Sequence, residues 1–388
     1  MFKTDYFFFK LFVLLSLFHR LVFTTSIGNF RLLHFCIPIM FVIILRHTKK
    51  TVGMKKYRKI FSILFLALCY GGLTYFSSKY QNGTVRIFFS MALNLTVFYF
   101  FIFFLETYKS KLSQILIYLK KLVELLSILT ILQWFGALAH IVPISQPGEG
   151  ILGVGRPGLF FGDPNWLGYF LLFMYAMVDT GRISCGLKIG GMYRILVFVA
   201  LLFMQSRVML MCFFLHYFYC VLNYKNKWIL IPFVLFFFIS FIDKEILLQI
   251  LPERFVYDIM DPDNNPRLID VENISEEVKH SHRQIWGMGW GSLGYIADIY
   301  PYRNYDITIN VWPGQIYYDF GYVGLYAFLM LTIVTFICIK SYHFKFLFAF
   351  FLLNCSFHMP GYYLYSWVLL GIGTYLYYNN KQLELLKR

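Results

Sequence analysis

The sequence contains few charged residues. Only 14% of its 388 residues are Asp, Glu, Lys or Arg, whereas 59% are hydrophobic. A soluble domain averages about 25% charged and about 45–50% apolar residues. A water-soluble fold of this length could not bury so many Phe, Tyr and Leu side chains, but a lipid bilayer solvates them. We therefore predict an all-α polytopic membrane protein, with residues 1–388 forming a single membrane domain.

The sequence also lacks a cysteine framework and an internal repeat. Its seven cysteines include no CxxC pair and lie mostly within apolar runs, so neither a disulfide scaffold nor a metal site is predicted. We expect no metal and no cofactor. The inverted repeat that marks many secondary transporters is absent as well.

Long apolar runs dominate the chain. A membrane-spanning helix needs about 20 mostly apolar residues, and about twelve runs qualify. The seventh and eighth could be one run, but basic residues on both sides favour a helical hairpin whose tip is Ser206-Arg207. The predicted spans lie near 6–27, 30–45, 60–78, 87–105, 122–142, 165–180, 189–206, 207–224, 228–242, 314–339, 345–359 and 361–378.

The net charge of +15 comes from short basic blocks between the apolar runs. The densest block, 46–59, is typical of a cytoplasmic loop that contacts anionic membrane lipid, and this arrangement argues against nucleic acid as a partner. Placing this block inside puts both termini in the cytoplasm. It also makes 243–313 one large extracytoplasmic loop.

Four polar clusters fall on the predicted outer side, three of them close to the end of a predicted span and one within the outer loop 243–313. Together they bring arginines, carboxylates and histidines to one face of the membrane. The clusters are 153–168 with Arg156, Asp163 and Asn165; the tip Ser206-Arg207; 280–294 with His280, His282 and Arg283; and 309–325 with Asn310 and Asp319.

Each cluster also has a purely structural interpretation. Asp163-Pro164-Asn165 makes a good helix start, and a lone arginine such as Arg207 often anchors a helix at the interface. A loop histidine is commonly just solvated, and the dipole at a helix N-terminus favours a carboxylate such as Asp319.

Several arginines on one face suit a diphosphate group. Guanidinium groups offer permanent charge and rigid paired donors, and a lipid-linked diphosphate presents its headgroup at this depth. We therefore predict a diphosphate clamp built from Arg156, Arg207 and either Arg267 or Arg283.

The four clusters resemble motifs of the O-antigen ligase and O-antigen polymerase superfamily of bacterial envelope glycosyltransferases. The family's Arg-containing run before a span is matched by Gly155-Arg156 through Leu167-Gly168, and its Ser-Arg pair by Ser206-Arg207. A glycine turn late in the outer loop and a closing motif complete the resemblance, which covers 150–335. They are matched by Gly287, Gly289, Gly291 and Ser292, and by Asn310, Asp319, Gly321, Gly324 and Leu325.

Two departures from the family pattern bear on the activity. A histidine that precedes the asparagine in the ligases is Ile309 here, and the family's glutamate is Asp319. Because that histidine is thought to help activate the ligase acceptor, the departures favour a polymerase over a ligase. The Gly289, Gly291, Asn165 and Asn310 matches are expected to shape the loops around the site.

The resemblance implies a reaction in the bacterial cytoplasmic membrane. A growing glycan would leave undecaprenyl diphosphate and join the next lipid-linked repeat unit, giving O-antigen, capsule or a similar polysaccharide. A chain-length regulator and a flippase are partners of such an enzyme. The base that deprotonates the attacking hydroxyl stays open among His282, His280, Asp319 and Asp163.

A different class of function, a transporter or flippase of lipid-linked glycan, would suit about twelve spans equally well. A transporter should place ionisable residues and broken helices at mid-membrane depth. The polar clusters gather at the outer face instead, with His19 and Arg20 in the first predicted span as the main exception.

Overall fold

The computed structural model describes most of the chain. It covers residues 2–18, 21–24, 29–78, 80–145, 154–185, 190–222, 275–292, 312–339, 342–355 and 364–386. The predicted span 228–242, most of the predicted outer loop 243–313, and the site candidates Arg267 and Asn310 lie outside these residues.

The chain divides into two compact units, which we describe separately. Unit 1 comprises Met1–Lys111 and Pro266–Arg388, and unit 2 comprises Leu112–Asn265. The elements of unit 1 are α1 (Phe2–Leu17), β1 (Val22–Thr24), β2 (Asn29–Arg31), η1 (Leu32–Cys36), α2 (Ile37–Arg46), η2 (Thr48–Tyr57), α3 (Arg58–Leu73), η3 (Thr74–Phe76), α4 (Gln81–Thr107), η4 (Lys109–Lys111), α14 (Trp312–Cys338), α15 (Tyr342–Cys355) and α16 (Leu364–Leu386).

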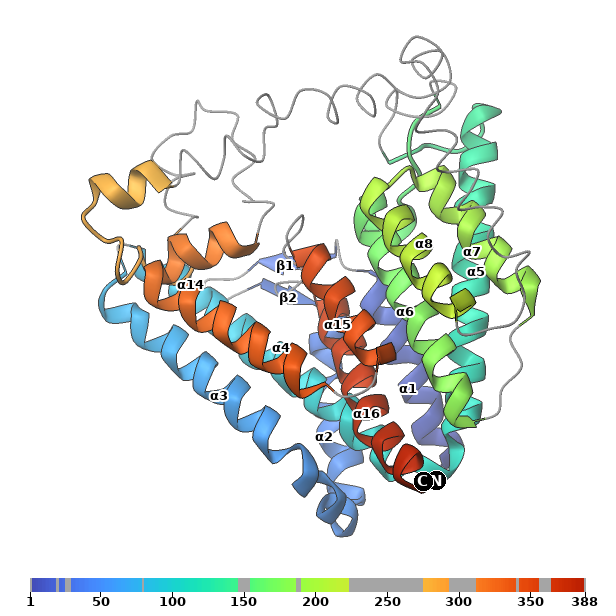
Figure 1. The fold of residues 1–388 in the computed structure, drawn as a ribbon, viewed down its shortest axis with the longest axis horizontal. Coiled ribbons are helices and arrows are strands. Elements are labelled where there is room, and N and C mark those ends of the chain that lie inside the picture. Colours follow the sequence, from blue (N-terminus) through green and yellow to red (C-terminus); the bar gives the residue numbers. More distant parts are fainter. Residues whose placement is uncertain are drawn as a thin grey trace. The chain divides into compact units, whose positions relative to one another are not determined.

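Helix α4 forms the core of unit 1. It packs along α16 and against α2 and α3 (Figure 1). Its stretch from Phe100 to Leu105 is apolar all round, as expected of a helix enclosed by others, and every side chain in it is buried. Gly371 of α16 allows the close approach, because an added Cβ would lie 3.0 Å from the Cβ of Phe101.

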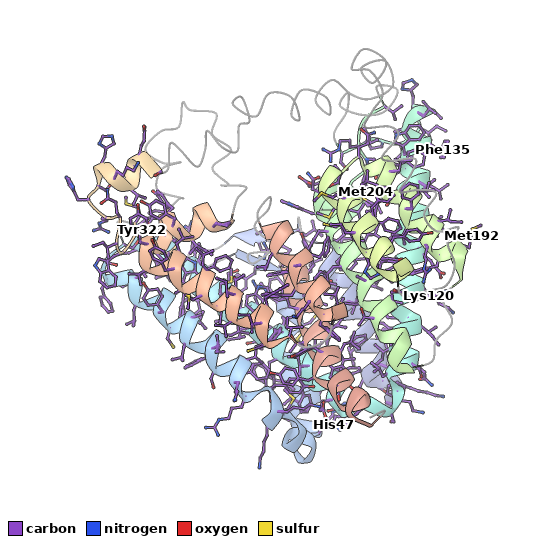
Figure 2. The ribbon with its side chains drawn as sticks, viewed as in Figure 1. His47, Lys120, Phe135, Met192, Met204 and Tyr322 are labelled. Atoms are coloured by element: carbon purple, nitrogen blue, oxygen red, sulfur yellow. The ribbon has the colours of Figure 1, made fainter. Side chains whose placement is uncertain are left out.

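Polar contacts close one end of unit 1, near His47 (Figure 2). The Nε2 atom of His47 lies 2.9 Å from the carboxylate of Asp5, which joins α2 to α1. The Lys56 ammonium lies 2.7 Å from the Glu106 carboxylate. These pairs lie at the basic block 46–59, and they tie it to α1 and α4.

The first predicted span is shorter than expected. In place of a helix over 6–27, α1 ends at Leu17, and an antiparallel pair of strands follows with Val22 opposite Arg31. The polar pair His19-Arg20 interrupts the apolar run, and Val22-Phe23-Thr24 has high strand propensity, which explains the change. The helix predicted over 30–45 is confirmed from Leu32 onwards by η1 and α2.

The described residues of unit 2 form a bundle of four helices. Its elements are α5 (Leu112–Leu138), η6 (Leu159–Phe161), α6 (Pro164–Cys185), α7 (Gly191–Met204) and α8 (Arg207–Leu222). Helix α6 packs against α5, α7 and α8, and every residue from Leu167 to Thr180 is buried. The prediction of two helices rather than one run over 189–224 is confirmed.

Three of the described helical segments are long and apolar enough to cross a membrane. They are Gly53–Phe76, Gln81–Thr107 and Pro313–Cys338. The apolar helices Leu32–Arg46 and Gly191–Met204 are shorter. The mostly helical fold and these segments agree with the predicted class, a helical membrane protein.

Candidate functional site

Arg156 connects the first two sequence motifs within unit 2. Its Nε–H donates to the carbonyl oxygen of Met204 at 2.9 Å, and its Nη2 donates to the Oδ1 of Asn165 at 3.1 Å. Met204 is the last residue of α7, where carbonyl groups lack helical partners, so the guanidinium group caps that helix. Ser206 and Arg207 follow within three residues.

Asp163 caps the start of α6, as its structural interpretation predicts. Its Oδ1 accepts from the backbone N–H of Asn165 at 2.7 Å and from that of Trp166 at 3.4 Å. Pro164 occupies the first helical position, where its missing N–H costs nothing. The side chains of Asp163 and Asn165 are partly exposed, so capping leaves them accessible.

The turn between α7 and α8 is sharp. Gln205 follows α7 as its C-cap in the left-handed region, with φ +52 and ψ +33, and its N–H donates to the carbonyl oxygens of Leu201 and Leu202. Ser206 is buried, and Arg207 is the first residue of α8. The side chain of Arg207 lies outside the described part of the chain.

The third and fourth motifs meet at a break in α14 of unit 1. Helical geometry is interrupted at Gly321, with φ +61 and ψ −158. The carbonyl groups of Tyr318 and Asp319 accept instead from the N–H groups of Met288, at 2.8 Å, and Gly289, at 3.0 Å. Tyr322 and Val323, whose N–H groups would normally use those carbonyls, donate to Gln284 and Ile285 at 2.8 and 3.2 Å. Four backbone hydrogen bonds thus seat segment 284–289 in the break.

Two positions of segment 284–289 require glycine, one packed against α14 and one packed against Ser78. An added Cβ at Gly287, which has φ +73, would lie 2.5 Å from backbone atoms of Asp319, Phe320 and Gly321. An added Cβ at Gly289, with φ +98, would lie 2.5 Å from the Cβ of Ser78. Gly291, the next glycine of the turn, has φ +79, a backbone region that favours glycine.

Asp319 lies inside this junction. Its side chain is fully buried, and its Oδ2 accepts from the Gln315 amide at 2.7 Å. Its Oδ1 accepts from the N–H of Gly291 at 3.3 Å. Oδ1 therefore holds the glycine turn against α14, while Oδ2 is fixed within α14 by Gln315, a positioning role for this residue.

Hydroxyl groups from α4 and from the connection between α3 and α4 hold the other side of the glycine turn. The Thr84 hydroxyl donates to the carbonyl of Trp290 at 2.6 Å, and the Trp290 N–H donates to the Thr74 hydroxyl at 3.0 Å. The hydroxyl oxygens of Ser78 and Ser292 are 3.0 Å apart. Segment 284–292 is thereby fixed between α14 and the adjoining ends of α3 and α4.

The two histidine candidates stand just before this seat. A helical segment over 275–280 leads towards the seat, and His280 and His282 are both exposed. His282 has φ +54, at the turn that leads into Arg283. The Arg283 guanidinium group donates to the carbonyl of Ser77, next to Ser78 of the glycine-turn contacts.

The candidates therefore fall into two groups. In unit 2, Arg156, Asp163 and Asn165 gather at the end of α7, near Met204 (Figure 2). In unit 1, the glycine turn, Asp319 and Arg283 gather where α14 breaks, just before Tyr322 (Figure 2). Each group unites two of the four motifs.

Sequence reasoning missed a buried ionic cluster in unit 2. Asp179 of α6 is 1% exposed; its carboxylate lies 3.3 Å from Nε2 of His216 in α8 and 3.6 Å from Arg194 in α7. The sequence feature that could have revealed this cluster is a carboxylate close to the end of an apolar run, because a buried charge needs partners. Its partners lie 15 and 37 residues away, a spacing that no local pattern reveals.

Within the described residues, no group of three or more His, Cys, Asp or Glu side chains could hold a metal ion. Comparisons with protein-family models, with curated proteins and with solved structures found no match for this chain.

Proposed function

We propose that this protein is a glycosyltransferase of the bacterial cytoplasmic membrane that polymerises undecaprenyl-diphosphate-linked repeat units into O-antigen, capsule or a similar surface polysaccharide. It would cross the membrane about twelve times with both termini in the cytoplasm. The loop 243–313 and the four motifs would lie on the outer side.

One observation carries the proposal. The motifs that resemble the O-antigen ligase and polymerase superfamily are distant in sequence but bonded to each other in pairs: Arg156 to the turn before Ser206-Arg207, and the glycine turn to Asp319. Motifs that arose by chance in apolar sequence would have no reason to form such hydrogen bonds.

The chemistry follows from these residues. A hydroxyl group on the non-reducing sugar of one repeat unit attacks the anomeric carbon of the donor glycan, and the bond from that carbon to the diphosphate oxygen breaks. The electron pair leaves with undecaprenyl diphosphate. Arg156, Arg207 and either Arg267 or Arg283 would stabilise the charge that develops on the leaving group.

The attacking hydroxyl must also lose its proton. Of the four candidate bases, His280 and His282 are exposed, whereas Asp163 and Asp319 are engaged with backbone N–H groups. We therefore assign proton transfer to a histidine, with His282 preferred because it adjoins Arg283, and positioning to the two carboxylates.

The test uses the purified full-length protein in nanodiscs, supplied only with the undecaprenyl-diphosphate-linked repeat unit of its own host. A ladder of lengthened glycans on a gel is the expected result. Glycan that moves only when a lipid A-core acceptor is added would replace polymerase by ligase. Absence of any transfer, together with movement of the lipid-linked unit across a vesicle membrane, would indicate a flippase.

A further inference from the structure

Within the described part of the chain, the side-chain amide of Gln205 is buried without a hydrogen bond that would explain its burial. Both amide atoms are buried, and neither has a hydrogen-bond partner among the residues that the structure describes. A buried amide without partners is destabilising, by an amount comparable to one or two lost hydrogen bonds. Such a group calls for an explanation, because most buried polar groups in proteins are hydrogen-bonded.

The backbone of Gln205 is also unfavourable for this residue type. A left-handed C-cap is normally glycine or asparagine, because a longer side chain is strained there. The cap explains the conformation but not the choice of glutamine, since glycine would cap α7 equally well without burying an amide.

A second unpaired donor lies close to the same end of the bundle. The Trp134 indole of α5 stacks on Phe203, with ring centroids 4.4 Å apart, two residues before Gln205. Trp134 is 4% exposed, and its Nε1–H has no partner among the described residues. Near the end of α7, the Gln205 amide and the Trp134 N–H are thus both without partners among the described residues.

The position of Gln205 relates it to the predicted diphosphate clamp. It lies between Met204, whose carbonyl accepts from Arg156, and Ser206-Arg207. In a lipid-linked substrate the first sugar is bonded directly to the diphosphate. A diphosphate held by Arg156 and Arg207 would bring that sugar to Gln205, which adjoins both the Arg156 contact at Met204 and the Ser206-Arg207 pair.

We propose that Gln205 recognises the sugar attached to the diphosphate, with its amide donating to one polar group of the sugar and accepting from another. A carboxamide offers one acceptor and two donors in one plane, which matches neighbouring hydroxyl groups or an acetamido group. Gln205 is then a specificity-determining residue. This inference rests on the proposed function, because it assumes a diphosphate-linked sugar as substrate.

The test compares the binding of two lipids to the full-length protein in nanodiscs: the undecaprenyl-diphosphate-linked repeat unit and undecaprenyl diphosphate without sugar. The wild type should bind the sugar-bearing lipid more tightly. In Gln205→Leu, which removes both hydrogen bonds, this preference should fall by about ten- to a hundredfold, while binding of the bare lipid stays unchanged.

Stability provides a second readout that a structural role would not reproduce. Because Gln205→Leu removes an unpaired buried amide, its melting temperature should equal or exceed that of the wild type. Gln205→Asn keeps an amide and tolerates the left-handed region, so it should retain part of the preference. Gln205→Gly, which relieves the strain but lacks the amide, should lose the preference as Gln205→Leu does.

The possible failures are distinguishable. If the wild type prefers the sugar-bearing lipid and Gln205→Leu keeps that preference, the assignment of Gln205 is wrong and the proposed function stands. If Gln205→Leu unfolds at a lower temperature, the amide has a structural partner and the assignment is also wrong. If the wild type binds neither lipid, both the proposed function and this inference fail.

Discussion

Replacing Gly321 by alanine should release segment 284–289 from α14. Gly321 has φ +61 and ψ −158, and an added Cβ would lie 2.5 Å from both the carbonyl carbon and oxygen of Ile285. A side chain in such a backbone region costs about 1–3 kcal/mol. Moving Ile285 away would also weaken the bonds from Tyr322 and Val323, at about 0.5–1.5 kcal/mol each. The free energy that holds segment 284–289 against α14 should therefore fall by about 2–6 kcal/mol.

The assay is limited trypsin digestion in nanodiscs, with cleavage after Arg283 followed by mass spectrometry. A loss of 2 kcal/mol raises the open population about thirtyfold, and cleavage should accelerate accordingly. Gly191→Ala is the matched control, because an added Cβ there meets nothing within 4 Å. Equal cleavage rates in the wild type, Gly321→Ala and Gly191→Ala would refute the hydrogen-bond exchange at the break.

Three further predictions concern single side chains. Arg156→Lys should keep the charge but lose the paired bonds to α7 and α6, so polymer formation should fall at least tenfold; a rate within twofold of the wild type, measured from gel ladders, would contradict this. Glu106→Gln breaks the 2.7 Å pair with Lys56 and should lower the free energy of unfolding by about 1–3 kcal/mol. Glu124→Gln, in the more exposed helical pair with Lys120, should lower it by less than about 0.5 kcal/mol. Equal losses in thermal unfolding would show that burial of the pair does not matter here. His282→Ala should lower the polymerisation rate about a hundredfold or more while leaving donor binding intact, and an unchanged rate would remove His282 as the base.

Local features of the sequence anticipated much of the fold. The helical hairpin broken near Ser206 and the Asp163 helix cap were both predicted, because turns and caps depend on neighbouring residues. The glycines near Gly289 were also singled out as loop-shaping, since positive φ and close backbone approach favour glycine.

Features that depend on distant partners were not visible in the sequence. The break at Gly321 falls within a long apolar run, and only the donors and acceptors of segment 284–289 make it possible. The contact of Asp179 with His216 likewise joins residues from two helices. The early end of α1 was signalled by His19-Arg20, but an apolar run on both sides outweighed that signal.

The most direct test of the proposed function counts the products of the reaction. Purified protein in nanodiscs, given only its lipid-linked repeat unit, should release one undecaprenyl diphosphate for every glycosidic bond formed, as measured by chromatography of the lipids alongside sizing of the glycans. Release of undecaprenyl diphosphate without longer glycans, or no release at all from competent substrate, would contradict the assignment as a polymerase.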